Sequence, residues 1–151
     1  MALTEGRSVG GRSESAWLAD EAATVAFGAR LAARLRPGML VYLHGDLGAG
    51  KTTLARGILR ALGHSGAVKS PTYTLLEPYE LPSYLVYHFD FYRIVDPQEL
   101  DFIGVDELLD SAAIKLVEWP ERVAGQLPAA DLVVRMRVAG EGRRIEMEFR
   151  A

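Results

Sequence analysis

Apolar positions follow two different periods along the chain, and these periods divide it into helices and strands. A helical spacing of apolar residues predicts a helix that begins at Asp20 and ends before Pro37. A continuous apolar run, residues 39–44, predicts a strand. Apolar positions then recur with helical spacing from Leu54 to Leu62, which predicts a second helix ended by a glycine. This half of the chain therefore reads helix, strand, helix.

The second half of the chain contains strand-like runs that end at turn-forming residues. Residues 73–79 and 84–90 are β-prone and are joined by a turn with a proline, which predicts a hairpin. Residues 113–119 form another apolar run, closed by a proline. Residues 132–138 and 145–149 alternate apolar with polar positions around a glycine-rich turn. This alternation predicts an antiparallel hairpin at the edge of the sheet.

Between the first strand and the second helix, residues 45–52 read GDLGAGKT and match the pattern G-x-x-x-x-G-K-[ST]. Glycines allow backbone N–H groups to surround an anion, and the helix that follows points its positive end at the same place. The flanking strand and helix are the context that this motif requires, so a chance glycine-rich turn is the weaker alternative. The predicted nucleotide-binding residues of this loop are Gly45, Asp46, Gly48, Ala49, Gly50, Lys51, Thr52 and Thr53.

Three side chains of this loop have predicted roles toward ATP. Lys51 places a positive charge near the β- and γ-phosphates, and the Thr52 hydroxyl is a ligand for the accompanying Mg²⁺. Thr53 lies within reach of the α-phosphate. We therefore expect an α/β fold of the P-loop NTPase kind, with three layers, a mixed and mainly parallel sheet, antiparallel hairpins, and helices on both faces.

Two predicted strands end in an acidic residue. Asp90 closes the run of residues 84–90, and Glu118 stands near the end of residues 113–119. A carboxylate at the end of a buried strand is the usual holder of magnesium or of its waters, although such acids also cap turns. Hydrolysis of a phosphoanhydride needs one group to hold the metal and another to orient or deprotonate water. Both acids are candidates for both roles, and the spacing leaves their division open.

Three further residues are candidates at the nucleotide. Thr72 follows Ser70 in a loop downstream of the second helix, where it is either a sensor of the γ-phosphate or part of an ordinary turn. Thr24 lies near a helix start that points toward a base or ribose. Trp119 either packs in the core or faces the nucleotide.

Size, composition and charge limit the classes of protein to which the chain can belong. The chain has 151 residues, of which 49% are hydrophobic and 25% charged, as expected of a globular protein. Residues 1–15 are predicted to be a flexible tail, and residues 16–151 a single P-loop ATPase domain. The chain has no cysteine and no apolar run of roughly 20 residues, so we expect a cytoplasmic location and no membrane contact. A net charge of −3 lacks the basic excess that direct binding of nucleic acid requires.

Four motifs in order resemble the bacterial TsaE (YjeE) family: GDLGAGKTT at residues 45–53, SPTY at 70–73, HFDFYR at 88–93 and VEWPE at 117–121. The resemblance covers residues 20–131. It implies an ATPase, weak alone, that works with the TsaB and TsaD proteins. Together they form the threonylcarbamoyl group on the adenosine beside the anticodon of tRNAs that read codons starting with adenine. The tRNA would be contacted only indirectly, through the complex.

The resemblance also implies roles for individual residues. Thr52 and Glu118 look like magnesium ligands, Asp90 looks like the acid required for hydrolysis, and Lys51 looks like the contact to the γ-phosphate. Thr72 would belong to a switch-like loop, Trp119 would lie near the nucleotide, and Arg143 would approach it from the closing hairpin.

Two other functions compete with this one. Several small-molecule kinases have a phosphate loop, a similar size and acids at strand ends, but they usually need an acceptor pocket and an arginine-bearing lid. Between Leu62 and Tyr84 this chain offers a β-hairpin instead. A nucleotide-sensing module without catalysis, in which Asp90 and Glu118 are structural, is the third possibility.

Overall fold

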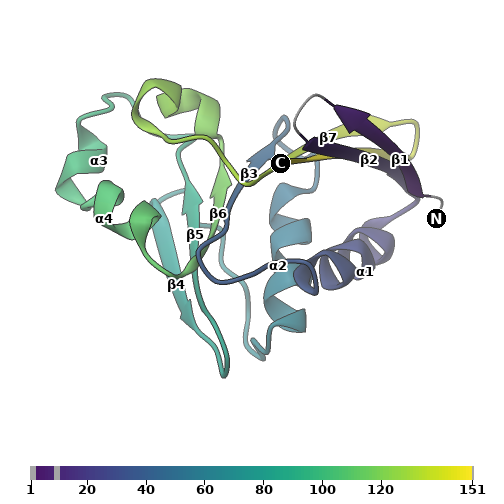
Figure 1. The fold of residues 1–151 in the computed structure, drawn as a ribbon, viewed down its shortest axis with the longest axis horizontal. Coiled ribbons are helices and arrows are strands. Elements are labelled where there is room, and N and C mark those ends of the chain that lie inside the picture. Colours follow the sequence, from purple (N-terminus) through teal and green to yellow (C-terminus); the bar gives the residue numbers. More distant parts are fainter. Residues whose placement is uncertain (1–2, 9–10, 151) are drawn as a thin grey trace.

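In the computed structural model, which describes residues 3–8 and 11–150, the described strands pair into one eight-stranded sheet in the order β1-β2-β8-β7-β3-β6-β5-β4 (Figure 1). The strands are β1 (Leu3–Ser8), β2 (Gly11–Leu18), β3 (Leu40–His44), β4 (Leu76–Glu80), β5 (Leu85–Asp90), β6 (Ile114–Glu118), β7 (Leu132–Ala139) and β8 (Gly142–Arg150). The helices are α1 (Glu21–Ala32), α2 (Lys51–Ala61), α3 (Glu99–Phe102), α4 (Val105–Asp110) and the 3₁₀ helix η1 (Pro120–Gln126).

The centre of the sheet is parallel and its flanks are antiparallel. β3 runs parallel to β6 and β7, and β6 runs parallel to β5. The predicted hairpins are present as β4–β5 and β7–β8. Because parallel strands bring their carboxyl ends to one edge, the loop after β3 lies beside the ends of β5 and β6. This arrangement confirms the predicted α/β fold and sets the place of the site.

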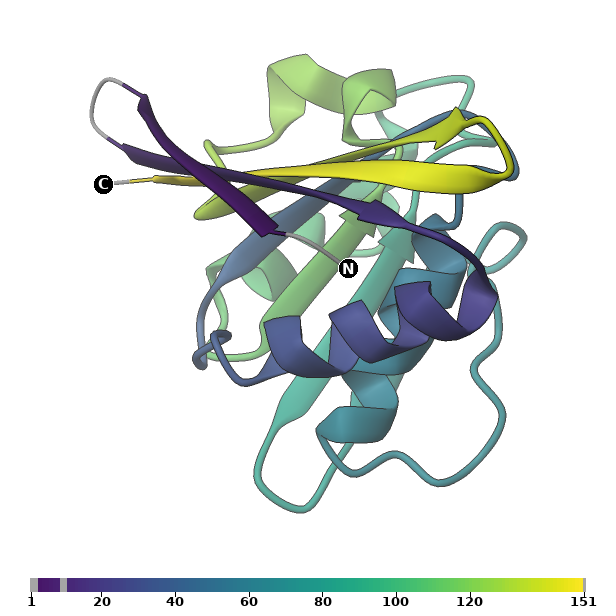
Figure 2. The same ribbon diagram turned by 90° about the vertical axis from the view of Figure 1, so that its right-hand side faces the viewer.

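Helices cover both faces of the sheet, so the fold has three layers. In Figures 1 and 2, α1 and α2 lie against one face, while α3, α4 and η1 lie on the other. Side chains of β3 alternate between the two cores: Val41 and Leu43 pack with the first pair of helices, and Leu40 and Tyr42 pack with the second group. Strands that are buried on both faces have continuous apolar sequences. This explains why the apolar run of residues 39–44 predicts β3 correctly. No helix in the described part of the chain is long and apolar enough to cross a membrane.

Helix α1 begins where the sequence predicts and packs closely on α2. The Asp20 carboxylate accepts a hydrogen bond from the backbone N–H of Ala23 at 2.8 Å, as an N-cap does. Gly28 and Gly57 allow the close crossing of the helices. A Cβ on Gly28 would lie 2.6 Å from the Leu54 carbonyl oxygen, and one on Gly57 would lie similarly close to the backbone of α1. The helix of the phosphate loop is thereby held against α1.

The prediction of a flexible tail is wrong for residues 11–15, which belong to β2, and residues 3–8 form β1. Positions 1, 2, 9 and 10 of that predicted tail, and residue 151 of the predicted domain, lie outside the described residues. Since β2 pairs with β8, the β7–β8 hairpin lies inside the sheet and not at its edge. The inward positions of β2 are Glu14, Ala16 and Leu18. Because one of these inward positions is a glutamate, the sequence of β2 lacks the regular alternation of apolar and polar residues that would predict a strand.

Glu14 is accommodated in the core by an arginine in the turn that follows α1. Arg34 donates to both carboxylate oxygens of Glu14, at 2.7 and 2.5 Å, and its guanidinium lies 4.2 Å from the centre of the Phe149 ring. The hydrogen bonds and the charge of Arg34 lower the pKa of the Glu14 carboxyl below its ordinary value of 4.5, against the opposing effect of burial. The ion pair therefore ties β2 to the main body of the protein.

Replacing Glu14 by Gln should lower the free energy of unfolding by about 2 kcal/mol at pH 7, because a buried charge-assisted pair is lost. A carboxyl with a lowered pKa in the folded state stabilises the protein above its ordinary pKa and loses that contribution as the pH falls. The difference between the two proteins should therefore shrink below about pH 4. Denaturant titrations of both proteins between pH 7 and pH 3 measure this difference in the free energy of unfolding.

Glu148→Gln is the matched control, because Glu148 pairs with Arg135 across 3.7 Å with both side chains about half exposed. An exposed pair contributes little, so this variant should lose less than about 1 kcal/mol. An equal loss in the two variants, or a difference that does not change with pH, would contradict the role given to Glu14.

Candidate functional site

The phosphate loop connects β3 to α2, and glycines at three points allow its shape. Gly48 and Gly50 have left-handed φ angles of +80° and +105°, and Gly50 is the N-cap residue of α2. At Gly45 a Cβ would lie 2.7 Å from the backbone carbonyl oxygen of Met136 on β7. Side chains at these positions would strain or displace the loop. The loop is thus a backbone-lined turn at the positive end of a helix, as phosphate binding requires.

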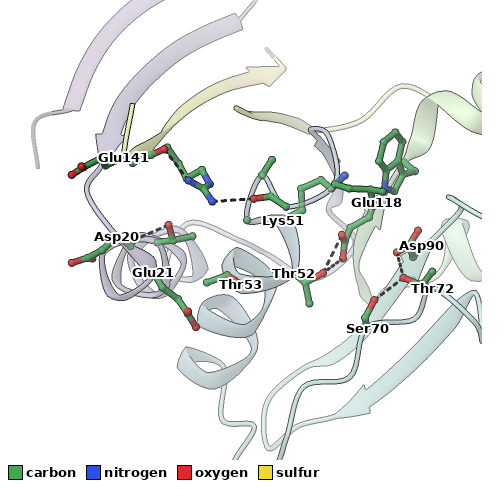
Figure 3. A pocket seen from close by; sticks show the side chains of 18 residues that line it. Asp20, Glu21, Lys51, Thr52, Thr53, Ser70, Thr72, Asp90, Glu118 and Glu141 are labelled. Atoms are coloured by element: carbon green, nitrogen blue, oxygen red, sulfur yellow. Dashed lines mark hydrogen bonds between the residues drawn. The ribbon is translucent and has the colours of Figure 1, made fainter. Parts of the chain in front are cut away.

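A cavity of about 410 Å³ opens at this loop (Figure 3). Its walls come from the start of α1, the loop, the residues after α2, the ends of β5 and β6, and the tip of the β7–β8 hairpin. Most of the predicted site residues line it: Thr24, Gly48, Ala49, Gly50, Lys51, Thr52, Thr53, Thr72, Asp90, Glu118, Trp119 and Arg143. Gly45 and Asp46 do not line the cavity; they shape the loop behind it, where the Asp46 carbonyl accepts from the Ala49 N–H at 3.0 Å.

The Lys51 side chain is held inside the site. It is 5% exposed, its ammonium donates to the Gly45 carbonyl oxygen, and it lies 3.8 Å from the centre of the Trp119 ring. Burial lowers the pKa of Lys51, while the charges of Glu118 and Asp90 act in the opposite direction. The two contacts place a cation at the mouth of the loop, where the outer phosphates of a nucleotide would lie.

Trp119 lies at the cavity and not wholly in the core. Its backbone has a left-handed φ of 57°, which is unusual for a residue other than glycine. The ring packs on Tyr92, with 4.8 Å between ring centres, and on the Lys51 ammonium. The left-handed turn after β6 thus turns Trp119 toward the loop, which favours the second of the two placements considered for it.

Glu118 and Thr52 lie side by side in the wall of the cavity (Figure 3). The Thr52 hydroxyl lies 3.2 and 3.1 Å from the two carboxylate oxygens of Glu118, and one of these oxygens lies 2.6 Å from Nε2 of His88. Within the described residues no group of three His, Cys, Asp or Glu residues could hold a metal. Magnesium in nucleotide sites is usually held by one or two carboxylates together with phosphates, so a hydroxyl and a carboxylate fit it.

Asp90 occupies the strand position beside Glu118, since the two residues are register partners on β5 and β6. Its carboxylate accepts from the Thr72 hydroxyl at 2.8 Å and from the Tyr92 N–H at 2.9 Å. The Ser70 hydroxyl lies 2.7 Å from that of Thr72. Burial raises the pKa of the Asp90 carboxyl, although both hydrogen bonds favour its ionised form. The loop after α2 is therefore coupled to Asp90 through one hydroxyl.

The opposite wall combines the start of α1 with the tip of the β7–β8 hairpin. Arg143 donates to the carbonyl oxygen of Gly48 at 3.1 Å, so the hairpin rests on the phosphate loop. Thr24 is buried and lines the cavity. Glu141 also lines it, and no motif identified this residue beforehand. Only the pairing of β7 with β3 and of β8 with β2, over long sequence distances, brings the hairpin tip here.

The comparisons with known proteins agree on one family. The family model described as threonylcarbamoyl adenosine biosynthesis protein TsaE matches residues 18–145. Several proteins named tRNA threonylcarbamoyladenosine biosynthesis protein TsaE are similar to most of this chain. The one from Haemophilus influenzae is 45% identical over 136 residues, 87% of this chain and 86% of the relative. The one from Bacillus subtilis is 39% identical over 120 residues, 80% of this chain and 74% of the relative.

A solved structure has the same fold. The crystal structure of Bacillus subtilis YdiB aligns with a TM-score of 0.80 and 30% sequence identity, and the alignment covers 93% of this chain and 88% of that one. The matched region of the family model includes the phosphate loop, both strand-end acids and Arg143. All walls of the cavity therefore fall within the region that the family model matches.

Proposed function

Because the chain belongs to the TsaE family, we propose that it is the ATP-binding and ATP-hydrolysing component in forming the threonylcarbamoyl group on adenosine beside the anticodon of tRNA. The tRNAs concerned are those that read codons starting with adenine. One observation carries the proposal: a phosphate loop faces two buried carboxylates that are register partners on neighbouring strands. Such a pair suits attack of water on a phosphoanhydride.

In this proposal different residues of the cavity bind the phosphates, hold magnesium and act on the attacking water. The backbone of the loop and the Lys51 ammonium bind the phosphates, and Arg143 and Thr24 contact the nucleotide from the opposite wall. Thr52 and Glu118 hold magnesium, which when bound neutralises charge on the phosphates. Asp90 orients or deprotonates the attacking water. Thr72, in the loop after α2, senses the γ-phosphate, and its hydrogen bond links that loop to Asp90.

The proposal includes protein partners. The net charge of −3 and the isoelectric point near 5.6 give the chain little intrinsic affinity for the phosphate backbone of tRNA. We therefore propose that TsaB and TsaD carry the tRNA-modifying chemistry, and that turnover of ATP by this chain resets their complex. ATP hydrolysis by the isolated chain would then be slow and would rise when both partners are present.

Radiolabelled ATP tests this function directly. The chain is incubated with ATP and Mg²⁺ alone, with TsaB and TsaD, and with each partner separately. Release of inorganic phosphate that rises when both partners are added supports the proposal. Transfer of label to a metabolite would instead indicate a small-molecule kinase, and binding without turnover in any mixture would indicate a nucleotide sensor.

A further inference from the structure

His88 lies on β5, two positions before Asp90, and its side chain is fully buried. Its Nε2 atom lies 2.6 Å from one carboxylate oxygen of Glu118 on the neighbouring strand β6. In the parallel register His88 stands beside Leu116, so the contact with Glu118 is diagonal, one side-chain step along the strand. His88 does not line the cavity. Whatever it contributes to the site must therefore act through Glu118.

The direction of this hydrogen bond follows from the role proposed for Glu118, because a carboxylate that binds magnesium is ionised. An ionised carboxylate only accepts hydrogen bonds, so the proton in this contact belongs to Nε2 of the imidazole. At 2.6 Å with a charged acceptor, the bond is short and strong. The other ring nitrogen, Nδ1, is buried and has no hydrogen-bond partner among the described residues. A buried polar atom without a partner is costly, so a side chain kept only for packing would be better apolar.

The two donors converge on the same carboxylate. Nε2 of His88 and the Thr52 hydroxyl both lie within hydrogen-bond distance of one Glu118 oxygen, at 2.6 and 3.1 Å. A glutamate side chain has several rotatable bonds, and the Thr52 hydroxyl alone would leave it free to turn. With His88 behind it, the carboxylate is held from the core side and from the cavity side at once.

We propose that His88 is a positioning residue whose Nε2–H holds the Glu118 carboxylate against Thr52, in the orientation that receives magnesium together with the nucleotide. The proposal rests on the proposed function, because it takes Glu118 and Thr52 as the magnesium ligands. Groups that hydrogen-bond to a metal ligand orient it, and their loss typically lowers metal affinity or activity by about 10- to 100-fold.

Two substitutions separate the hydrogen bond from the shape of the side chain. His88→Gln places an amide N–H as many bonds from Cβ as Nε2 is, and so retains the donor. His88→Asn places the amide where Nδ1 is, too far from Glu118. The measurement is the dissociation constant of a non-hydrolysable ATP analogue by calorimetry, first with excess Mg²⁺ and then with EDTA. The ratio of the two constants gives the contribution of the metal without any turnover.

His88→Gln should keep the ratio within about threefold of the unaltered protein, and His88→Asn should lower the magnesium contribution about tenfold or more. Both variants should bind the analogue in EDTA as the unaltered protein does, because the loop and Lys51 are intact. An unchanged ratio in His88→Asn, or equal losses in both variants, would overturn the proposal. If the chain binds the analogue but never hydrolyses ATP, the proposed function fails while this ratio still tests His88.

A measurement on the unaltered chain covers the case in which His88→Asn does not fold. In protein labelled with ¹⁵N, the imidazole of His88 should show its proton on Nε2, protected from exchange with solvent and shifted by the bond to Glu118. The signal should move when Mg²⁺ and the ATP analogue are added together. A proton on Nδ1 with a bare Nε2 would overturn the proposal, because no donor would then face the carboxylate.

Discussion

Asp90→Asn should retain ATP binding within a few-fold of the unaltered chain and lose about a hundred- to ten-thousandfold in the rate of ATP hydrolysis. The amide has the size of the carboxylate and keeps an oxygen that accepts from the Tyr92 N–H or the Thr72 hydroxyl. The local structure should therefore survive. The amide cannot accept a proton from water, so only steps after binding are affected.

Single-turnover hydrolysis and calorimetric binding, both with the partner proteins present, measure the two quantities separately. Asp101→Asn is the control: it makes the same chemical change at an exposed position of α3, outside the cavity. This variant should bind and hydrolyse ATP normally. Normal turnover by Asp90→Asn would mean that the carboxylate of Asp90 is not needed for the reaction, and Glu118 would then have to carry both roles.

The parts of the site that were predictable from the sequence depend on local patterns. The phosphate loop has a fixed spacing, and it follows a strand whose burial on both faces makes it a continuous apolar run. Asp90 and Glu118 each end a strand of the same kind. Parallel strands then bring their ends to one edge without further information, which is why these residues meet at the cavity as expected.

The parts that were not predictable depend on contacts between distant segments. β2 was missed because Glu14 occupies an inward position, which the double hydrogen bond from Arg34, 20 residues later, makes tolerable. Glu141 reaches the cavity because β2 and β3 fix the place of the β7–β8 hairpin. The bond from His88 to Glu118 depends on strand register, which spacing along one strand cannot reveal.

Lys51→Ala should weaken the binding of ATP by about a hundredfold or more, with or without magnesium. The Lys51 side chain is buried in the wall that the phosphate loop contributes to the cavity. Its ammonium donates to the Gly45 carbonyl oxygen, beside the place expected for the phosphates. Alanine removes both its charge and its hydrogen bonds from a buried position, where charge-assisted bonds are strong. Helix propensity favours alanine at this position, so α2 should remain folded.

Calorimetric titration with a non-hydrolysable ATP analogue measures the loss, and Lys69→Ala is its control, because Lys69 is exposed and lies outside the cavity. Lys51→Arg should also bind poorly: the planar guanidinium is wider than the ammonium and does not fit the space between Gly45 and the Trp119 ring. The loss in Lys51→Ala should be the same in EDTA as in Mg²⁺, unlike that of a change at His88. Binding within threefold of the unaltered chain would show that the backbone of the loop alone holds the triphosphate.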